Sequence, residues 1–138
     1  MADIPADALI VVADGRGARL FRNQGSAHEL SLKQESSLKP KHLMEEGPSG
    51  SRPEEQSPQQ TDEATFSKQL ANMLHTQLEE KKYKALVLIA DPQSLGQIRD
   101  AMHASVKQSL VLSLNKELTG HSLLEIEKAL RTKEVEAR

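Results

Sequence analysis

Two aspartates stand where an α/β protein could hold metal ions. Asp14 follows the aliphatic run 8–13, and Asp91 follows a second aliphatic run, 85–90. If these runs form neighbouring parallel strands, both carboxylates lie at the carboxyl ends of the strands, where open α/β sheets place their ligands. Paired carboxylates at such a place can hold Mg²⁺ ions for phosphodiester cleavage. A magnesium-dependent nuclease that uses Asp14 and Asp91 is therefore one hypothesis.

Both aspartates also have ordinary structural explanations, and the sequence favours these. Asp14 begins Asp-Gly-Arg-Gly, a composition typical of a tight turn. Asp91 precedes Pro92, as a helix N-cap precedes a proline in the first turn. A ribonuclease-H-type metal site needs further carboxylates, which the pattern does not supply. We therefore expect no metal, no cofactor and no catalytic residue.

The sequence lacks the residue patterns that other common catalytic mechanisms require. The chain has no cysteine, which excludes thiolate nucleophiles and cysteine-type zinc sites. Its five histidines show neither His-x-x-His nor His-Glu-x-x-His spacing, and no Gly-x-Ser-x-Gly or glycine-rich phosphate loop occurs. The sequence thus favours a binding protein over an enzyme, with no small-molecule substrate indicated.

Basic residues form two local groups, one in a predicted hairpin and one around a predicted loop. If the hairpin and the start of the loop are adjacent, the groups form one positive edge suited to RNA phosphates. A solvated charged face is the simpler alternative. With 2% aromatic residues, base stacking is weak. The candidate binding residues are Arg16, Arg19, Arg22, Lys39, Lys41, His42 and Arg52.

Hydropathy patterning indicates the elements that position these residues. The two continuous aliphatic runs are typical of strands buried on both faces. The pattern predicts strands at 8–13, 18–23, 28–34, 85–90 and 109–114, and helices from 61 to about 82, from 92 and from 122. This order, β-β-β-α-β-α-β-α, predicts an α/β fold: a mixed five-stranded sheet in the order 3-2-1-4-5 with helices on both faces.

Residues 36–60 differ from the rest of the chain. They hold four of the six prolines, five serines and two glycines, with few large aliphatic residues. Such a stretch buries too little surface to offset its ordering entropy. We expect a flexible loop there, within a single domain spanning 1–138.

Composition limits where the protein acts. Its 138 residues carry a net charge of −2, so nucleic-acid binding requires a local positive patch. The acidic start and the absence of a long apolar run predict a cytoplasmic protein without a membrane partner.

Three separated motifs recur in order: Val11 to Phe21 around Asp-Gly-Arg-Gly, Leu86 to Arg99 around Ala-Asp-Pro, and Leu114 to Thr119 with the closing Glu125-Ile-Glu127. Together they resemble the host attachment protein family, bacterial proteins described as required for attachment to host cells. Asp91 departs from the family pattern, which more often has a small or apolar residue at this position. The resemblance implies an indirect role in attachment, because the sequence indicates no export signal.

That family is similar to the middle domain of eukaryotic and archaeal class I peptide-chain release factors, which has a ribonuclease-H-like fold. There an Asp-Gly-x-Gly-Ala pattern like Asp14 to Ala18 forms the hairpin, and a basic segment like Lys39-Pro-Lys-His42 leads into a loop bearing Gly-Gly-Gln. That loop promotes hydrolysis of peptidyl-tRNA. Here the loop reads Glu46-Gly-Pro-Ser-Gly50-Ser-Arg52, and Gly-Gly-Gln is absent. The resemblance therefore implies a ribosome-facing surface without release activity.

The leading hypothesis is a non-enzymatic binding protein that engages RNA or a ribosomal component through its hairpin and loop. The magnesium-dependent nuclease is one alternative. A structural homodimer that pairs through the exposed edge strand 28–34 is another, because an unpaired edge can accept a second strand.

Overall fold

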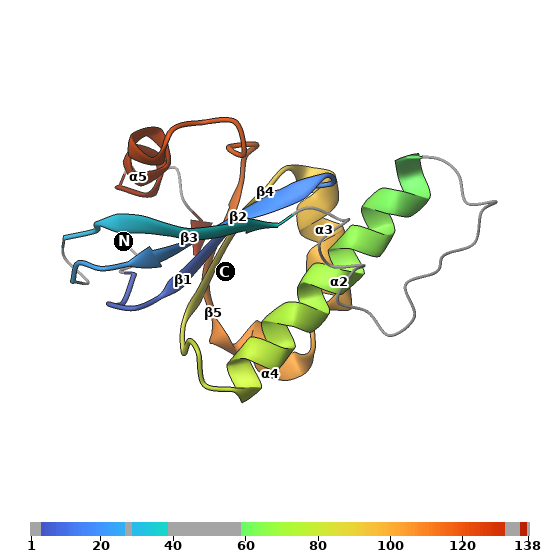
Figure 1. Ribbon diagram of the computed structural model, residues 1–138, viewed down its shortest axis with the longest axis horizontal. Helices are drawn as coiled ribbons and strands as arrows, with labels where there is room; N and C mark the ends of the chain where they lie inside the picture. Colours follow the sequence, from blue (N-terminus) through green and yellow to red (C-terminus); the bar gives the residue numbers. More distant parts are fainter. Residues whose placement is uncertain (1–3, 27–28, 39–58, 132–135, 138) are drawn as a thin grey trace.

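A computed structural model describes residues 4–26, 29–38, 59–131 and 136–137. They form a mixed sheet in the order β3-β2-β1-β4-β5-β6, with helices on both faces (Figure 1). The strands are β1 (Leu9–Asp14), β2 (Gly17–Asn23), β3 (Leu32–Leu38), β4 (Leu86–Ala90), β5 (Leu110–Asn115) and β6 (Glu136–Ala137). The helices are α2 (Gln59–Glu79), α3 (Pro92–Ala101), α4 (Ala104–Ser109) and α5 (Leu123–Arg131).

The two aliphatic runs lie side by side at the centre of the sheet, as predicted. β1 pairs in parallel with β4 and antiparallel with β2, and β4 pairs in parallel with β5. All five residues of β4 are buried, and so are the first five of β1. Both faces of these strands are covered, which explains why neither shows an alternating pattern.

Each face of the sheet has its own hydrophobic core. Helices α2, α3 and α4 cover one face, where Phe66, Leu70 and Leu74 of α2 are fully buried. Helix α5 covers the other face, with Ile126 fully buried against it. Burial of one such side chain contributes about 1.5–3 kcal/mol. Phe66, Leu70 and Leu74, four positions apart, form the apolar stripe of α2.

The third strand lies further along the chain than predicted. It spans Leu32–Leu38 rather than 28–34, and its pairing with β2 shifts between Leu20 and Phe21. The register skips Glu35, which marks a bulge in β3. Residues before the strand are instead used in a turn, where the Ser31 carbonyl oxygen accepts the backbone N–H of Gln24 at 2.7 Å.

Three further features differ from the prediction: an additional helix, an additional strand and the ends of α2. A short helix, α4, precedes β5, with the His103 ring accepting the Ser105 N–H at its N-cap. A two-residue strand, β6, pairs antiparallel with β5 and extends the sheet. Helix α2 begins at Gln59 and ends at Glu79, so Lys81 and Lys82 follow the helix rather than forming its last turn.

The predicted loop 36–60 is shorter at both ends in the structure. Residues 36–38 belong to β3, and residues 59 and 60 begin α2. The remainder of the predicted loop, 39–58, lies outside the described residues.

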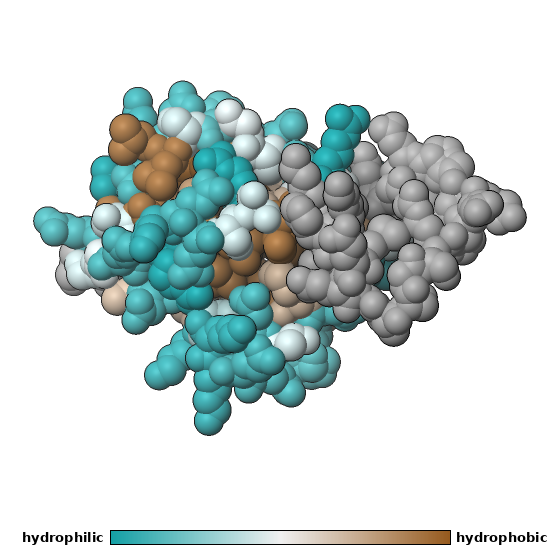
Figure 2. Space-filling model, viewed as in Figure 1, coloured by the Kyte–Doolittle hydropathy of each residue, from teal (hydrophilic) through white to brown (hydrophobic). Residues whose placement is uncertain are grey.

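Polar groups dominate the molecular face seen in Figure 2. Apolar surface gathers over α5, where Leu124 is 72% exposed. Among the described helices, none has the length and apolar character needed to cross a membrane.

Gly96 lies in the interior of α3, where no steric constraint requires a glycine. A Cβ built at this position meets no atom within 4 Å, whereas one built at Gly25 lies 1.9 Å from the Glu29 carbonyl oxygen. Glycine in a helix interior destabilises it by roughly 0.5–1 kcal/mol relative to alanine. We therefore expect Gly96→Ala to raise the free energy of unfolding by about that amount in urea titrations. Gly25→Ala, the matched control, must lower it; equal effects of the two substitutions would contradict this reading.

Candidate functional site

Three connections meet at one end of the sheet. The turn Asp14–Gly17 follows β1, Asp91 follows β4, and residues 116–122 follow β5. Because β1, β4 and β5 are parallel, these connections lie at the same end. We call this end the carboxyl edge. It is the end where ligands bind in open α/β sheets.

The chain also leaves β3 at the carboxyl edge. Leu38, the last residue of β3, pairs with Ala18, and Gly17 pairs with Asp14 across the hairpin. The end of β3 at Leu38 therefore lies beside the hairpin. Four candidate binding residues follow Leu38 in the sequence and lie outside the described residues: Lys39, Lys41, His42 and Arg52.

Asp14 organises the hairpin turn. One carboxylate oxygen accepts the Arg16 backbone N–H at 2.7 Å, as in an Asx turn. The other accepts the Thr119 hydroxyl at 2.7 Å, which ties the turn to the segment after β5. Both oxygens are thus engaged in holding the carboxyl edge together.

Asp91 is the N-cap of α3, as predicted. Its carboxylate accepts the Ser94 N–H at 3.2 Å, and Pro92 occupies the first turn. The register that aligns Ala13 with Ala90 also brings Asp14 and Asp91 to the ends of adjacent strands. Within the described ranges, no group of three metal-ligating side chains comes together. Each of the two carboxylates accepts hydrogen bonds that hold its own turn or helix start.

Arg19 is a structural clamp rather than a free cation. Its guanidinium donates to the carbonyl oxygens of Thr119 and His121 and makes two bonds to Gln34 Oε1, at 3.1 and 3.3 Å. It also lies 5.1 Å from the centre of the Phe21 ring. One side chain thereby fixes the 116–122 segment to β2 and β3.

The guanidinium of Arg22 is also hydrogen-bonded within the fold. It pairs bidentately with Glu35, at 3.0 and 3.1 Å, and donates to the carbonyl oxygens of Asp7 and Lys82. Glu35 is the residue that the β2–β3 register skips, so the bulge places its carboxylate against this arginine. Bidentate arginine–carboxylate pairs are the strong, geometrically specific kind.

The three hairpin arginines do not form one patch. Arg19 lies opposite Val12, on the α5 face, whereas Arg22 lies opposite Leu9, on the α2 face. Three residues of separation in a strand put side chains on opposite faces. Arg16, in the turn, is exposed at the carboxyl edge. Of the three, Arg16 alone has a side chain without a hydrogen bond or ion pair to a described residue.

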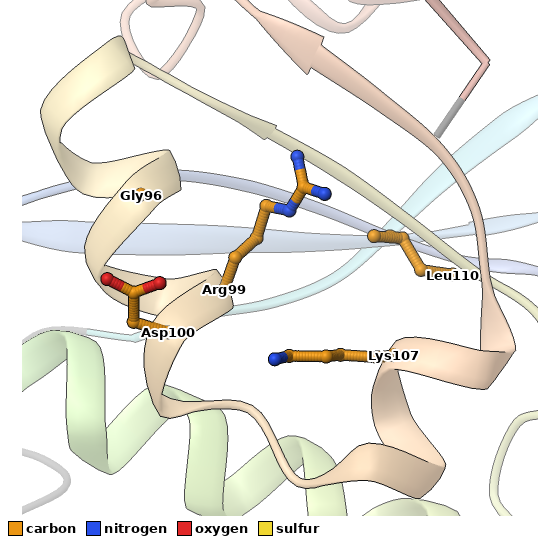
Figure 3. A pocket seen from close by; sticks show the side chains of 5 residues that line it. All are labelled: Gly96, Arg99, Asp100, Lys107 and Leu110. Carbon is orange, nitrogen blue, oxygen red and sulfur yellow. The ribbon is translucent and has the colours of Figure 1, made fainter.

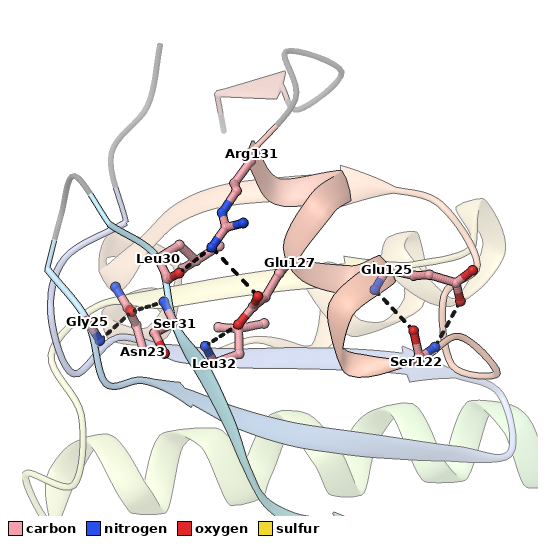
Figure 4. Close-up of polar contacts among 9 residues, drawn as sticks. All are labelled: Asn23, Gly25, Leu30, Ser31, Leu32, Ser122, Glu125, Glu127 and Arg131. Carbon is pink, nitrogen blue, oxygen red and sulfur yellow. Dashed lines mark hydrogen bonds and ion pairs between the residues drawn. The ribbon is translucent and has the colours of Figure 1, made fainter.

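Asn23 is a fully buried polar residue that the sequence analysis missed (Figure 4). Its amide nitrogen donates to the carbonyls of Ile4 and Pro5 at 3.0 and 3.1 Å. Its amide oxygen accepts the N–H groups of Gly25 and Ser31 at 2.9 and 3.1 Å. An asparagine two residues before a glycine is a recognisable turn signal. The sequence could therefore have indicated this role.

Glu127 is the second missed residue. It is buried, accepts the Leu32 N–H at 2.7 Å and lies 3.7 Å from Arg131, which donates to the Leu30 carbonyl (Figure 4). This network docks α5 onto the start of β3. A glutamate on an amphipathic helix usually indicates the solvent face, so no sequence signal pointed to it.

A capping box opens α5. The Ser122 hydroxyl accepts the Glu125 N–H at 3.1 Å, and Glu125 accepts the Ser122 N–H at 3.0 Å (Figure 4). This backbone N–H bond lowers the pKa of the Glu125 carboxyl below its usual value. The capping box fixes Ser122, the last residue of the 116–122 segment, to the first turn of α5.

Comparison with known proteins gives one family match. The model of bacterial archaeo-eukaryotic release factor family 12 matches residues 7–130, from just before β1 to the last turn of α5. No curated protein matches the chain. The match covers strands β1 to β5 and the helices that pack on them, and it supports the release-factor relationship inferred from the motifs. The chain belongs to bacterial archaeo-eukaryotic release factor family 12 and is a module related to translation factors.

Proposed function

We propose that this protein is a non-enzymatic binding module that engages RNA or a ribosomal component through the carboxyl edge. The observation that carries the proposal is the pairing of Leu38 with Ala18. It brings Leu38, the residue before Lys39 in the sequence, beside the hairpin that carries exposed Arg16. The relationship to release factors supports a ribosomal target.

The binding surface that we propose is small and electrostatic. Arg19 and Arg22 are occupied within the fold, so the binding cations are Arg16, Lys39, Lys41, His42 and Arg52. Lysine and arginine contacts to phosphates release counterions, and affinity then falls steeply with salt. With a net charge of −2, the protein as a whole has no positive field that would attract RNA from a distance.

Peptide release is not part of this function. No two glycines are adjacent anywhere in the sequence, so Gly-Gly-Gln is absent. Paired glycines permit backbone conformations that other residues rarely adopt. We propose that the relationship to release factors has been kept as a binding surface, located in the cytoplasm with the ribosome. Any role in host attachment, as the motif resemblance suggests, then follows indirectly from this binding.

The two alternative functions have less support. A nuclease needs Asp14 free for a metal, but both of its oxygens accept hydrogen bonds within the fold. A dimer through the edge strand meets Lys33 and the bulged Glu35, and charges and bulges are what natural edge strands use against pairing. Neither alternative is included in the proposal.

Ribosome co-sedimentation tests the proposed function. We expect the wild-type protein to pellet with ribosomes in low salt and to be released as salt rises. Substituting Arg16, Lys39 and Lys41 together by alanine should reduce the bound fraction at least tenfold, because every phosphate-binding cation that is removed weakens the attraction for RNA. Arg19 is left intact, since its replacement would disturb the fold.

A charge-matched variant provides the control. Lys68, Lys84 and Lys128 are exposed and lie away from the carboxyl edge, on α2, before β4 and on α5. Substituting these three by alanine removes the same charge and should leave co-sedimentation within twofold of wild type. Absence of wild-type association in low salt, or equal loss in both triple variants, refutes the proposal.

A further inference from the structure

A second cationic site lies at the other end of the sheet. An open cavity of about 440 Å³ is lined by Gly96, Arg99, Asp100, Lys107 and Leu110. Leu110 is the first residue of β5, whereas the carboxyl edge lies where β5 ends. The cavity is therefore separate from the carboxyl edge.

Two cations from different helices line the cavity. Arg99 extends from the last turn of α3 and Lys107 from the last turn of α4; in Figure 3 Lys107 reaches towards α3, and Arg99 extends towards β4. Among the described lining residues, Asp100 is the one acid. The lining therefore carries two positive charges against one negative charge.

Neither cation is used by the described part of the fold. The Arg99 guanidinium and the Lys107 ammonium make no hydrogen bond or ion pair with any residue that the structure describes. The carbonyl oxygens of both residues already accept the capping N–H groups of Met102 and Leu110. Cations near helix C-termini do offset the macrodipole. That effect does not require the two side chains to share one cavity.

Gly96 leaves the wall of this cavity open. It lies in the interior of α3, where glycine disfavours the helix, and a Cβ there would touch nothing. Packing therefore does not explain the glycine. Absence of a side chain does keep the space in front of Arg99 and Lys107 clear, as close approach of a ligand to a helix backbone requires.

We propose that this cavity binds the phosphate of a ribonucleotide, either free or within a strand. Arginine presents a planar fork that matches phosphate oxygens, and lysine adds a compact positive charge. Asp100 is an acceptor for a ribose hydroxyl. The cavity is open, and its described lining residues include no aromatic side chain. The site is therefore expected to recognise the phosphate and ribose without discriminating strongly among bases.

Isothermal titration calorimetry on the full chain tests this proposal with four probes. These are AMP, inorganic phosphate, adenosine and a six-residue oligoadenylate. AMP is expected to bind, phosphate to bind more weakly, and adenosine not to bind. Binding of the oligonucleotide alone, if abolished in the cavity variants below, would identify a strand phosphate as the source and support the site. Adenosine binding as tightly as AMP, or no binding by any phosphate compound, would overturn the proposal.

Three variants locate the binding. Arg99→Ala and Lys107→Ala should each raise the Kd at least tenfold, because each removes a charge-assisted hydrogen bond to phosphate. Gly96→Leu keeps both cations, fills the cavity with a good helix former, and should also raise the Kd at least tenfold. Lys68→Ala removes one exposed charge from α2 and should change the Kd less than twofold. Binding that survives all three cavity variants, or falls equally with Lys68→Ala, rejects the site.

Discussion

Asn23→Ala is expected to lower the free energy of unfolding by about 3–4 kcal/mol. The side chain is fully buried and bridges the N-terminal segment at Ile4 and Pro5 to the turn at Gly25 and Ser31. Alanine would leave buried carbonyl and N–H groups unpaired, and each costs about 1–3 kcal/mol. Because the turn precedes β3, the substitution should also loosen the strand that leads to the carboxyl edge.

Urea unfolding followed by circular dichroism measures this effect. Gln24, the next residue, has an exposed side chain, so Gln24→Ala should change the free energy of unfolding by less than about 0.5 kcal/mol. A decrease below about 1 kcal/mol for Asn23→Ala would show that the buried amide network contributes little.

Arg19→Ala should lower the free energy of unfolding by about 2–3 kcal/mol, while Arg16→Ala should change it by less than about 0.5 kcal/mol. Arg19 holds the carbonyls of Thr119 and His121 and the side chain of Gln34. Arg16 is exposed in the turn, and its backbone rather than its side chain bonds to Asp14. Sequence alone treats the two arginines alike.

Thermal and urea unfolding separate the two arginines, and ribosome co-sedimentation gives the complementary result. Arg16→Ala should weaken co-sedimentation without loss of stability. Arg19→Lys keeps the charge but cannot make the forked bonds to Gln34 and to two carbonyls, so it should recover less than half of the stability that Arg19→Ala removes. Full recovery by lysine would mean that charge alone, and not the clamp geometry, supports the 116–122 segment.

The centre of the fold could be predicted because its signals are local. Two continuous aliphatic runs indicated strands buried on both faces, and Asp-Gly-Arg-Gly indicated the hairpin between β1 and β2. Asp91-Pro92 and the capping box at Ser122 marked the starts of α3 and α5. Each signal depends on residues close in sequence, where turn and capping chemistry act.

The edge of the fold could not be predicted in the same way. Residues 33–37 of β3 are exposed, so hydropathy carries little information on where the strand begins. Its position follows from the turn at Gly25 and from Glu127, which accepts the Leu32 N–H across 95 residues of sequence. Hydrogen bonds between such distant residues leave no periodic pattern.

The sequence predicted which connections share one end of the sheet, but not the roles of their side chains. The sequence brought Asp14, Asp91 and the start of the predicted loop to one end of the sheet, and the structure shows both aspartates and Leu38 there. It grouped three arginines that the strand period separates, because Arg19 and Arg22 are three residues apart on β2. Whether a basic side chain is free or is a clamp depends on distant carbonyl groups, which only the fold reveals.

Photocrosslinking from position 16 tests the central claim most directly. A photoreactive residue at Arg16, in the exposed turn, should crosslink to ribosomal RNA or to a ribosomal protein in a low-salt mixture with ribosomes. The same residue at Lys128, exposed on α5, should give no such product. The account predicts crosslinks from position 16 that disappear as salt rises. Equal products from both positions, or products from position 128 alone, would contradict the assignment of binding to the carboxyl edge.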